Sequence, residues 1–386
     1  MKILQICPPW ISIPPKNYGG TEWVIYNLTE ELVKQGHDVT LFATGATTTS
    51  AKLKFVYNQG LFEQNDASWS LMQPALALPA LVHYDQAFKE AESGHYDMIH
   101  AHLSAGTDIM KLKFLADCRV PVVATTHMVF PFDKWSYNDD QFIKFYAKDV
   151  KIICISHTQS RLYPSQFAKL GVVHNGLNMD LMTYNPQPTG WEGQPYLTWL
   201  GKIMPWKGLD IAIQVALKTN YPLIFAGVLD EHNHPESAIY FKQKVEPFID
   251  GHRIRFLGPA DLKLKNQLLG NAFAFLNPIT WDEPFGMVST EAMATGTPVI
   301  SFARGGANET VAHQYSGYLV DTQQQMIQAV QSVANIKRQH CRQHVQDNFS
   351  ASAMAQKYLA LYRQAMQPSS DYQAPPAYTS SPNQNP

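Results

Sequence analysis

The chain has 386 residues, a length that allows two domains, each with a hydrophobic core of its own. Hydrophobic residues make up 45% of it and charged residues 16%, which is ordinary for a soluble globular enzyme. The formal net charge of −2 at pH 7 gives no electrostatic reason to expect nucleic acid or an anionic membrane surface as the main partner.

Cysteine usage and the absence of targeting patterns favour a reducing compartment. The four cysteines are scattered and form no C-x-x-C pair, so they predict neither a zinc site nor a disulfide framework. No apolar leader with a cleavage site precedes the first strand pattern. The most apolar segment, residues 71–82, is short and contains Pro74 and Pro79. We therefore expect a cytoplasmic protein with no transmembrane segment and at most a weak membrane association.

Strand and helix patterns alternate through the first half of the chain. A buried strand is predicted at 2–7, followed by an amphipathic helix at 21–35 that Gly36 ends, and by a second strand at 38–43. Further runs of strand type lie at 98–100, 120–125, 152–155 and 172–174. The region 45–85 gives no clear pattern and is left unassigned. Short β-branched runs alternating with helices predict a parallel sheet covered on both faces.

A second series of the same kind begins after the proline-rich polar stretch 185–188, which has linker character. Its strands are expected at 196–200, 223–226, 254–257, 272–276, 299–302 and 317–320, and its helices at 208–219, 236–249 and 262–271. We predict an α/β protein with two Rossmann-like, doubly wound domains that face a cleft, where ligands meet the carboxyl ends of the strands. A helix at 350–366 closes the globular part, and the proline-rich tail 367–386 is predicted to be disordered.

The most informative segment runs from Asp282 to Glu291. Glu283 and Glu291 lie eight positions apart, with Pro-Phe-Gly between them, a strand pattern before them and a helix around the second. The N-terminus of that helix suits an anion, because its backbone N–H groups are unpaired. Carboxylates beside such a site repel phosphate, so they more plausibly accept hydrogen bonds from hydroxyl groups. A ligand with phosphate in the middle and hydroxyl-rich groups at both ends is a nucleotide sugar.

This segment resembles the E-x7-E motif of retaining GT-B glycosyltransferases of the family 4 type, the glycosyl transferases of group 1. The resemblance extends from residue 1 to about 365. It implies an acceptor-side N-terminal domain at 1–185, a nucleotide-sugar-binding domain at 186–349, and a helix at 350–366 that returns to the first domain. It also implies that Glu283 contacts the transferred sugar and Glu291 the nucleotide ribose. Backbone N–H groups would meet the sugar and the phosphate at Phe285, Gly286, Met287 and Val288.

Two lysines are the candidates for stabilising the leaving diphosphate. Lys202 and Lys207 follow the first strand of the second domain, and Gly208 opens the next helix. Cations placed there in advance stabilise the charge that grows as the diphosphate departs. The family has two phosphate-contacting basic residues in the matching motif, commonly with Arg at the position of Lys202. Lys cannot hold phosphate with two parallel bonds. The plain alternative is a pair of solvated surface lysines.

Two motifs of the first domain are expected to face the same cleft. Gly19 and Gly20 separate the first strand from its helix, and they lack the third glycine of a dinucleotide-binding loop. They fit the glycine loop of the resembled family, which closes on the diphosphate or the acceptor. His127 ends a strand on the cleft side, where the family places a His against the donor sugar. A purely structural, hydrogen-bonded His is the alternative.

Two other glycine turns are less specific. Asn175-Gly176 resembles the family's turn near the crossover between domains and equally suits an ordinary tight turn. Gly305-Gly306 opens a short helix that we expect beside the nucleotide, with Glu309 in a structural role.

Together these motifs predict a retaining glycosyltransferase that moves a hexose from a UDP-glucose or GDP-mannose type of donor. The acceptor is a hydroxyl of a glycan, a lipid or a small molecule in glycan or glycoconjugate synthesis. No cofactor, metal or nucleic acid is expected. No carboxylate is singled out as a nucleophile for double displacement, so the resemblance implies attack on the same face, assisted by the leaving phosphate.

Other functions stay open at this point. A GT-B nucleotide-sugar epimerase would turn over without an acceptor, and a catalytically silent nucleotide-sugar-binding protein would bind without turnover. A phosphorylase needs a far longer chain and a pyridoxal-bearing lysine. A glycosidase is disfavoured by the phosphate-binding features around the paired carboxylates.

Overall fold

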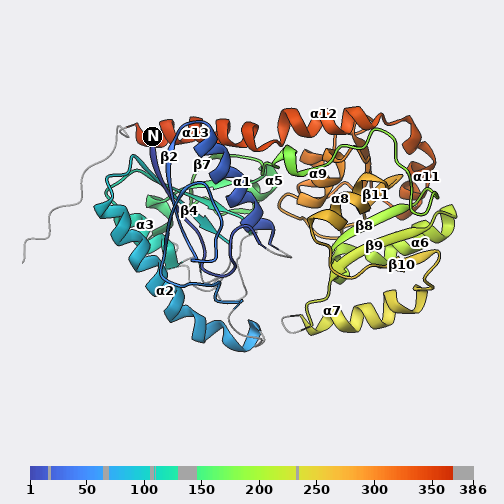
Figure 1. The fold of residues 1–386 in the computed structure, drawn as a ribbon, viewed down its shortest axis with the longest axis horizontal. Helices are drawn as coiled ribbons and strands as arrows, with labels where there is room; N and C mark the ends of the chain where they lie inside the picture. The colour runs from blue at the N-terminus through green and yellow to red at the C-terminus, as the bar shows by residue number, and fades with distance from the viewer. Residues whose placement is uncertain are drawn as a thin grey trace, which may run out of the picture.

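The computed structural model describes residues 1–15, 19–63, 69–104, 108, 110–128, 146–231 and 234–367, and the side chains of residues 69–76 are left out of the description. The predicted disordered tail lies outside these residues from position 368 onward. The described chain forms two lobes that lie side by side, with helices spanning both along one edge (Figure 1).

The first lobe is built on a parallel seven-stranded sheet of order β3-β2-β1-β4-β5-β6-β7. Its strands are β1 (Lys2–Ile6), β2 (Asp38–Ala43), β3 (Lys52–Phe55), β4 (Met98–Leu103), β5 (Val122–Thr126), β6 (Lys151–Cys154) and β7 (Ala168–Val172). The helices α1 (Gly20–Lys34), α2 (Trp69–Ser93), α3 (Lys111–Asp117) and α5 (His157–Leu162) connect them. β1 pairs with β2 on one side and β4 on the other, so the order of strands reverses there.

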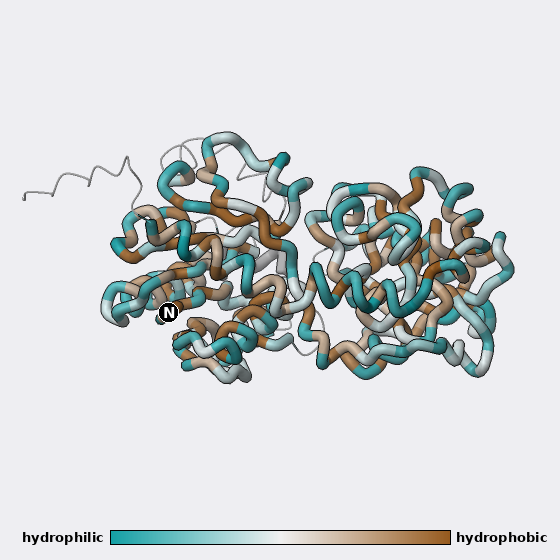
Figure 2. Tube along the Cα trace, turned by 90° about the horizontal axis from the view of Figure 1, so that it is seen from above, coloured by the Kyte–Doolittle hydropathy of each residue, from teal (hydrophilic) through white to brown (hydrophobic). Residues whose placement is uncertain are grey.

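The second lobe contains a parallel six-stranded sheet of order β10-β9-β8-β11-β12-β13. Its strands are β8 (Leu197–Lys202), β9 (Leu223–Val228), β10 (Ile254–Phe256), β11 (Ala274–Asn277), β12 (Val299–Phe302) and β13 (Gly317–Val320). Its helices are α6 (Leu209–Thr219), α7 (Pro235–Tyr240), α8 (Leu262–Gly270), α9 (Met287–Ala294), α10 (Ala307–Thr310), α11 (Gln323–Ser332) and α12 (Arg338–Asn348). Hydrophobic strands lie inside each lobe within more hydrophilic segments (Figure 2). The predicted pair of doubly wound α/β halves is confirmed.

The last helix, α13 (Ala351–Met366), lies on the first lobe although it follows the second in sequence (Figure 1). Its side chains Tyr358 and Tyr362 are buried and hydrogen-bond to Thr125 and His100 of that lobe, at 3.0 Å and 2.7 Å. Where the chain crosses between lobes, its two passages bond to each other. The Leu177 amide donates to the Phe349 carbonyl at 2.8 Å, and the Ala351 amide to the Leu177 carbonyl at 2.7 Å.

Three segments differ from the sequence-based expectation. The unassigned region 45–85 holds β3 and the start of α2, a helix that passes through Pro74 and Pro79. From residue 80 onward the helix buries Ala80, Tyr84, Ala87, Phe88 and Ala91 at helical spacing against the core. This burial favours the helix despite the two prolines.

The other two differences are shifts of boundary. β7 begins four residues before the apolar run expected at 172–174, because it is an edge strand whose partly exposed residues need no continuous apolar pattern. The helix expected at 236–249 becomes α7, one π turn and one 3-10 turn, the last of which contains Pro247. Among the helices of the described ranges, none combines the length and the apolar character that a bilayer crossing requires.

Candidate active site

A cleft of about 690 Å³ lies between the lobes, a size typical of small-molecule sites. Residues that follow the carboxyl ends of β1, β5, β8 and β11 line it, as expected for parallel sheets. The structure brings all of the sequence-predicted site residues to this one cleft. They are Gly19, Gly20, His127, Lys202, Lys207, Glu283, Phe285, Gly286, Met287, Val288 and Glu291.

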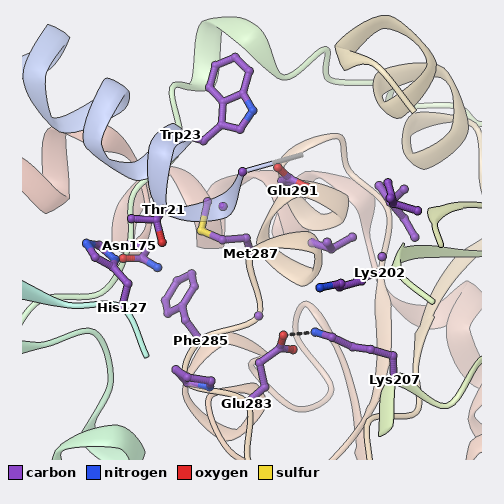
Figure 3. A pocket seen from close by; sticks show the side chains of 18 of the residues that line it. Thr21, Trp23, His127, Asn175, Lys202, Lys207, Glu283, Phe285, Met287 and Glu291 are labelled. Atoms are coloured by element: carbon purple, nitrogen blue, oxygen red, sulfur yellow. Dashed lines mark hydrogen bonds and ion pairs between the residues drawn. The ribbon is translucent and has the colours of Figure 1, made fainter. Parts of the chain in front are cut away.

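Lys207 and Glu283 form an ion pair inside the cleft (Figure 3). The backbone at Lys207 is fixed by the Trp199 indole N–H, which donates to its carbonyl at 3.2 Å. Gly208 follows with a φ of 69°, and a Cβ there would lie 2.1 Å from the carbonyl oxygen of Pro278. Only glycine permits that approach, which holds Lys207 beside the loop after β11.

The N-terminus of α9 opens into the cleft. Gly286 caps it with a φ of 87°, in the left-handed region that favours glycine, and the N–H groups of Met287 and Val288 follow. Phe285 is buried, and its ring lies 5.8 Å from that of Phe349 between centroids, which anchors the loop to the core. The unpaired N–H groups of the first turn can meet an anion.

The other two predicted charged groups, Lys202 and Glu291, are also paired, with partners that sequence reasoning missed. Lys202 forms an ion pair with Asp230, and Glu291 accepts a hydrogen bond from Lys265 at 2.7 Å. Asp230 comes two residues after β9, so its place at a strand's carboxyl end was the available signal. Lys265 lies within α8, and nothing in its local sequence distinguishes it from a surface lysine.

His127 approaches the cleft from the first lobe, on the same side as Thr21 and Asn175 (Figure 3). Its Nε2 lies 3.1 Å from Nδ1 of His102, whose Nε2 contacts Oε1 of Gln5 at 3.2 Å. Burial, and to a smaller extent the charge of Lys111, lowers the pKa of His127 to about 3. The imidazole is therefore neutral at pH 7 and offers a hydrogen bond to a ligand, not a charge.

Asn175 is 4% exposed and lines the cleft, and its Oδ1 has no hydrogen-bond partner within the described residues. The following Gly176 lies against the second crossover: a Cβ there would be 2.6 Å from the Ser350 carbonyl oxygen. The turn therefore combines a cleft-facing amide with a close packing of the chain's two passages between lobes.

The glycine turn before α10 packs against the backbone of the loop that carries Glu283. Gly305 and Gly306 pack behind the Glu283 loop, where the Gly306 amide donates to the Glu283 carbonyl at 2.7 Å. They are not among the cleft-lining residues of the described chain, so their expected place beside the nucleotide stays a prediction that the cleft does not support. Their sequence pattern resembles a ligand-binding turn, but their lack of side chains serves close backbone packing here.

Glu309 of α10 joins the two lobes. Its carboxylate accepts hydrogen bonds from the backbone N–H groups of His157 and Thr158, at 2.8 Å and 2.7 Å, and lies 2.9 Å from Nε2 of His174. Burial alone would raise its pKa, but the bonds to His174, His157 and Thr158 outweigh it and lower the pKa to about 2.

Two family models divide this chain between them. The Glycosyltransferase Family 4 model matches residues 18–181, and the model described as glycosyl transferases group 1 matches residues 183–348. The chain belongs to the group 1 glycosyltransferases. The junction between the two models falls at the crossover near residue 182, so the glycosyltransferase lobes correspond to the two matches.

Relatives of this glycosyltransferase differ in what they act on. A phosphatidyl-myo-inositol mannosyltransferase of Propionibacterium freudenreichii subsp. shermanii is 24% identical over 314 residues, covering 78% of this chain and 77% of that protein. Spore coat protein SA of Bacillus subtilis is 23% identical over 405 residues, covering 94% and 99%.

Solved structures share the fold. Sucrose-phosphate synthase from Thermosynechococcus elongatus superposes with a TM-score of 0.74 at 20% identity, covering 94% of this chain and 99% of its own. Anabaena HepE in complex with UDP and glucose superposes with a TM-score of 0.69 at 18% identity, covering 94% of this chain and 100% of its own. The GT-B fold predicted from the sequence is confirmed.

Proposed function

We propose that this glycosyltransferase is a retaining hexosyltransferase that uses a nucleoside-diphosphate sugar. The observation that carries the proposal is the arrangement around the N-terminus of α9. Glu283 and Glu291 flank that anion-binding end, and Lys202 and Lys207 stand opposite it in the same cleft (Figure 3). The two carboxylates can accept hydrogen bonds from the hydroxyl groups at both ends of a nucleotide sugar, and the two lysines can bind the diphosphate between them.

The proposed roles follow the positions of these groups. Glu291, oriented by Lys265, holds the ribose, and the N–H groups of α9 with Lys202 and Lys207 hold the diphosphate. Glu283 and neutral His127 hold the hexose. Gly19 and Gly20 let the first lobe approach the ligand closely.

The proposed reaction breaks the bond between the anomeric carbon and the phosphate oxygen. The acceptor oxygen forms its bond to that carbon on the same face, and the acceptor proton passes to the departing phosphate. Lys207 is paired with Glu283 and Lys202 with Asp230 before the donor binds, so the diphosphate must share or replace these partners. Preorganised cations stabilise the diphosphate more as its charge grows, which accelerates departure.

The relatives support a UDP-glucose or GDP-mannose type of donor, since one is named a mannosyltransferase and HepE is in complex with UDP and glucose. We propose a glycan, lipid or small-molecule hydroxyl as acceptor, a cytoplasmic location, and no cofactor requirement. Lysines and α9 would supply the positive charge in place of a metal, so transfer should continue in EDTA.

A donor screen tests the function. The full chain would be melted with UDP-glucose, GDP-mannose and ADP-glucose, because a ligand that binds the folded state raises its melting temperature. Donors that stabilise it would then be assayed for turnover, and the anomeric configuration of the product read by NMR. Inversion, or no stabilisation by any of the three, would contradict the proposal. Turnover to a new nucleotide sugar without acceptor would indicate an epimerase, and binding without turnover a silent binding protein.

A further inference from the structure

Glu22 places a buried carboxyl group on the first-lobe wall of the cleft, opposite the groups assigned to the donor. It lies in the first turn of α1, is 8% exposed, and makes no hydrogen bond or ion pair with another residue's side chain within the described chain. Burial raises its pKa most, its own backbone N–H lowers it, and the charges of Asp108 and Glu63 raise it further, so that together they bring the pKa to about 7. Within the described chain this carboxyl group is bonded to its own backbone N–H and to no other residue's side chain. A buried carboxylate with so few hydrogen bonds is costly, so a ligand that donates to it would relieve that cost.

A role in capping α1 does not account for this side chain. An acid at this position of a helix often reaches back to the backbone N–H before the helix. Within the described chain Glu22 makes no such bond to Gly19, the residue before the helix, although its carboxylate lies close to it: a Cβ at Gly19 would be 2.7 Å from Oε2 of Glu22. Glu30 of the same helix shows the contrast, since Thr49 and Ser50 satisfy it outside the cleft.

The surroundings of Glu22 on this wall combine apolar surface with an unused donor. Trp10 and Phe62 both line the cleft and stack with ring centroids 5.0 Å apart. The Trp10 side chain is 3% exposed, and its indole N–H is buried with no hydrogen-bond partner within the described residues. A sugar ring presents an apolar face and hydroxyl groups that both donate and accept, which complements an aromatic pair, an N–H and a carboxylate.

Among the residues that the structure describes, the charged groups acting on Glu22 disfavour an anionic ligand. Asp108 is fully buried and receives the Ser104 amide at 2.7 Å, while Glu63 receives the Gly60 amide at 2.9 Å. Lys111, a buried cation of the same lobe, lies 3.7 Å from Asp108 and donates to the His102 carbonyl, so its charge is already engaged. A phosphate group brought against Glu22 and Glu63 would meet like charge.

We propose that Glu22 positions and selects the acceptor, a neutral carbohydrate whose hydroxyl donates a hydrogen bond to the Glu22 carboxylate. This inference rests on the proposed function, because it assigns the first-lobe half of the cleft to the acceptor. It adds the class of acceptor and a residue that distinguishes a neutral sugar from its phosphate ester.

The test compares the parent chain with Glu22→Gln, which keeps the shape and removes the charge, and with Glu31→Gln on the same helix outside the cleft as a matched control. Nucleotide release from UDP-glucose or GDP-mannose would be measured alone and with four acceptor probes. The probes are methyl α-glucoside, methyl α-mannoside, glucose 6-phosphate and mannose 6-phosphate. Release without acceptor reports the donor half of the cleft alone.

The parent should use the neutral probes with a kcat/KM at least about tenfold higher than that for the phosphorylated probes. Glu22→Gln should raise KM for the neutral probes by about tenfold or more, because one hydrogen bond to a charged group is lost. Its nucleotide affinity and acceptor-free release should match the parent and Glu31→Gln, and its melting temperature should be at least that of the parent, because the variant no longer buries a carboxylate. The assignment would be overturned if the parent preferred the phosphate esters or if no probe accelerated nucleotide release. It would also be overturned if Glu22→Gln lost acceptor-free release and transfer equally. Failure of the proposed function looks different, since the parent itself would then neither bind nor cleave a donor.

Discussion

Individual side chains in the cleft are held by partners that a donor would have to share. Glu283 is paired with Lys207, Glu291 with Lys265 and Lys202 with Asp230. A substitution at one member therefore also changes the charge environment of the other. This coupling shapes the outcomes expected for single variants.

Glu283→Gln should keep nucleotide binding and lose most transfer. A charge-assisted hydrogen bond at the hexose is worth roughly 1.5–3 kcal/mol, or about one to two orders of magnitude in rate. Turnover and calorimetric affinity for the nucleoside diphosphate would be measured on the same preparation. Near-normal turnover with every donor would contradict the role given to Glu283.

Lys207→Ala should weaken both the nucleoside diphosphate and the intact donor and slow the transfer. The loss of one preorganised cation costs about 2–4 kcal/mol, and Glu283 is left unpaired beside the phosphates. The double variant with Glu283→Gln removes that repulsion, so it should bind the diphosphate better than Lys207→Ala alone. Unchanged diphosphate affinity in the single variant would show that Lys207 does not face the phosphates.

His127→Ala should reduce transfer and leave affinity for the nucleoside diphosphate nearly unchanged, because His127 is assigned to the sugar. Its bond to His102 is also lost. Kinetics and a thermal melt separate the two contributions. A large fall in melting temperature with normal activity in the remaining folded protein would indicate a structural residue instead.

Among the elements, α13 carries the strongest consequence for stability. Met354, Tyr358 and Tyr362 are each buried in the first lobe. Deletion of residues 367–386 should leave melting temperature and turnover unaltered, as the tail lacks apolar content. Deletion from residue 350 should destabilise the protein, because it removes those buried side chains. The two truncations would be compared by melting and turnover, and loss of activity in the shorter deletion would show that the tail belongs to the working enzyme.

Sequence patterns predicted the elements well where burial follows the period of the strand or helix. β12 and β13 match their predicted bounds. α2 was missed, because Pro74 and Pro79 argue against a helix and only tertiary packing from Ala80 onward overrides them. The candidate residues that line the cleft were predicted from motif and strand-end position. Lys265 was not, since its pairing with Glu291 depends on how α8 lies against α9.

Across the whole molecule, Glu309 makes the contact between lobes sensitive to acid. Its folded-state pKa of about 2 lies below the ordinary 4.5. The charged form therefore contributes fully to the free energy of unfolding above pH 4.5, and this contribution is lost as the pH falls toward 2. Glu309→Gln should cost about 2–3 kcal/mol at pH 7, where charged hydrogen bonds are lost, and much less at pH 3. Melting curves at both pH values would check this, and an equal deficit at both would contradict it.

The paired passages at Leu177 and Phe349–Ala351 have a mechanical consequence. The two crossover segments that join the lobes are hydrogen-bonded to each other. They therefore act as one paired connection and not as two independent linkers. Sliding of one lobe past the other would break these bonds, whereas rotation about the paired connection keeps them. We therefore expect the lobes to rotate about this paired connection more readily than to slide, which would change the distance between the wall holding Glu22 and His127 and the wall holding Glu283.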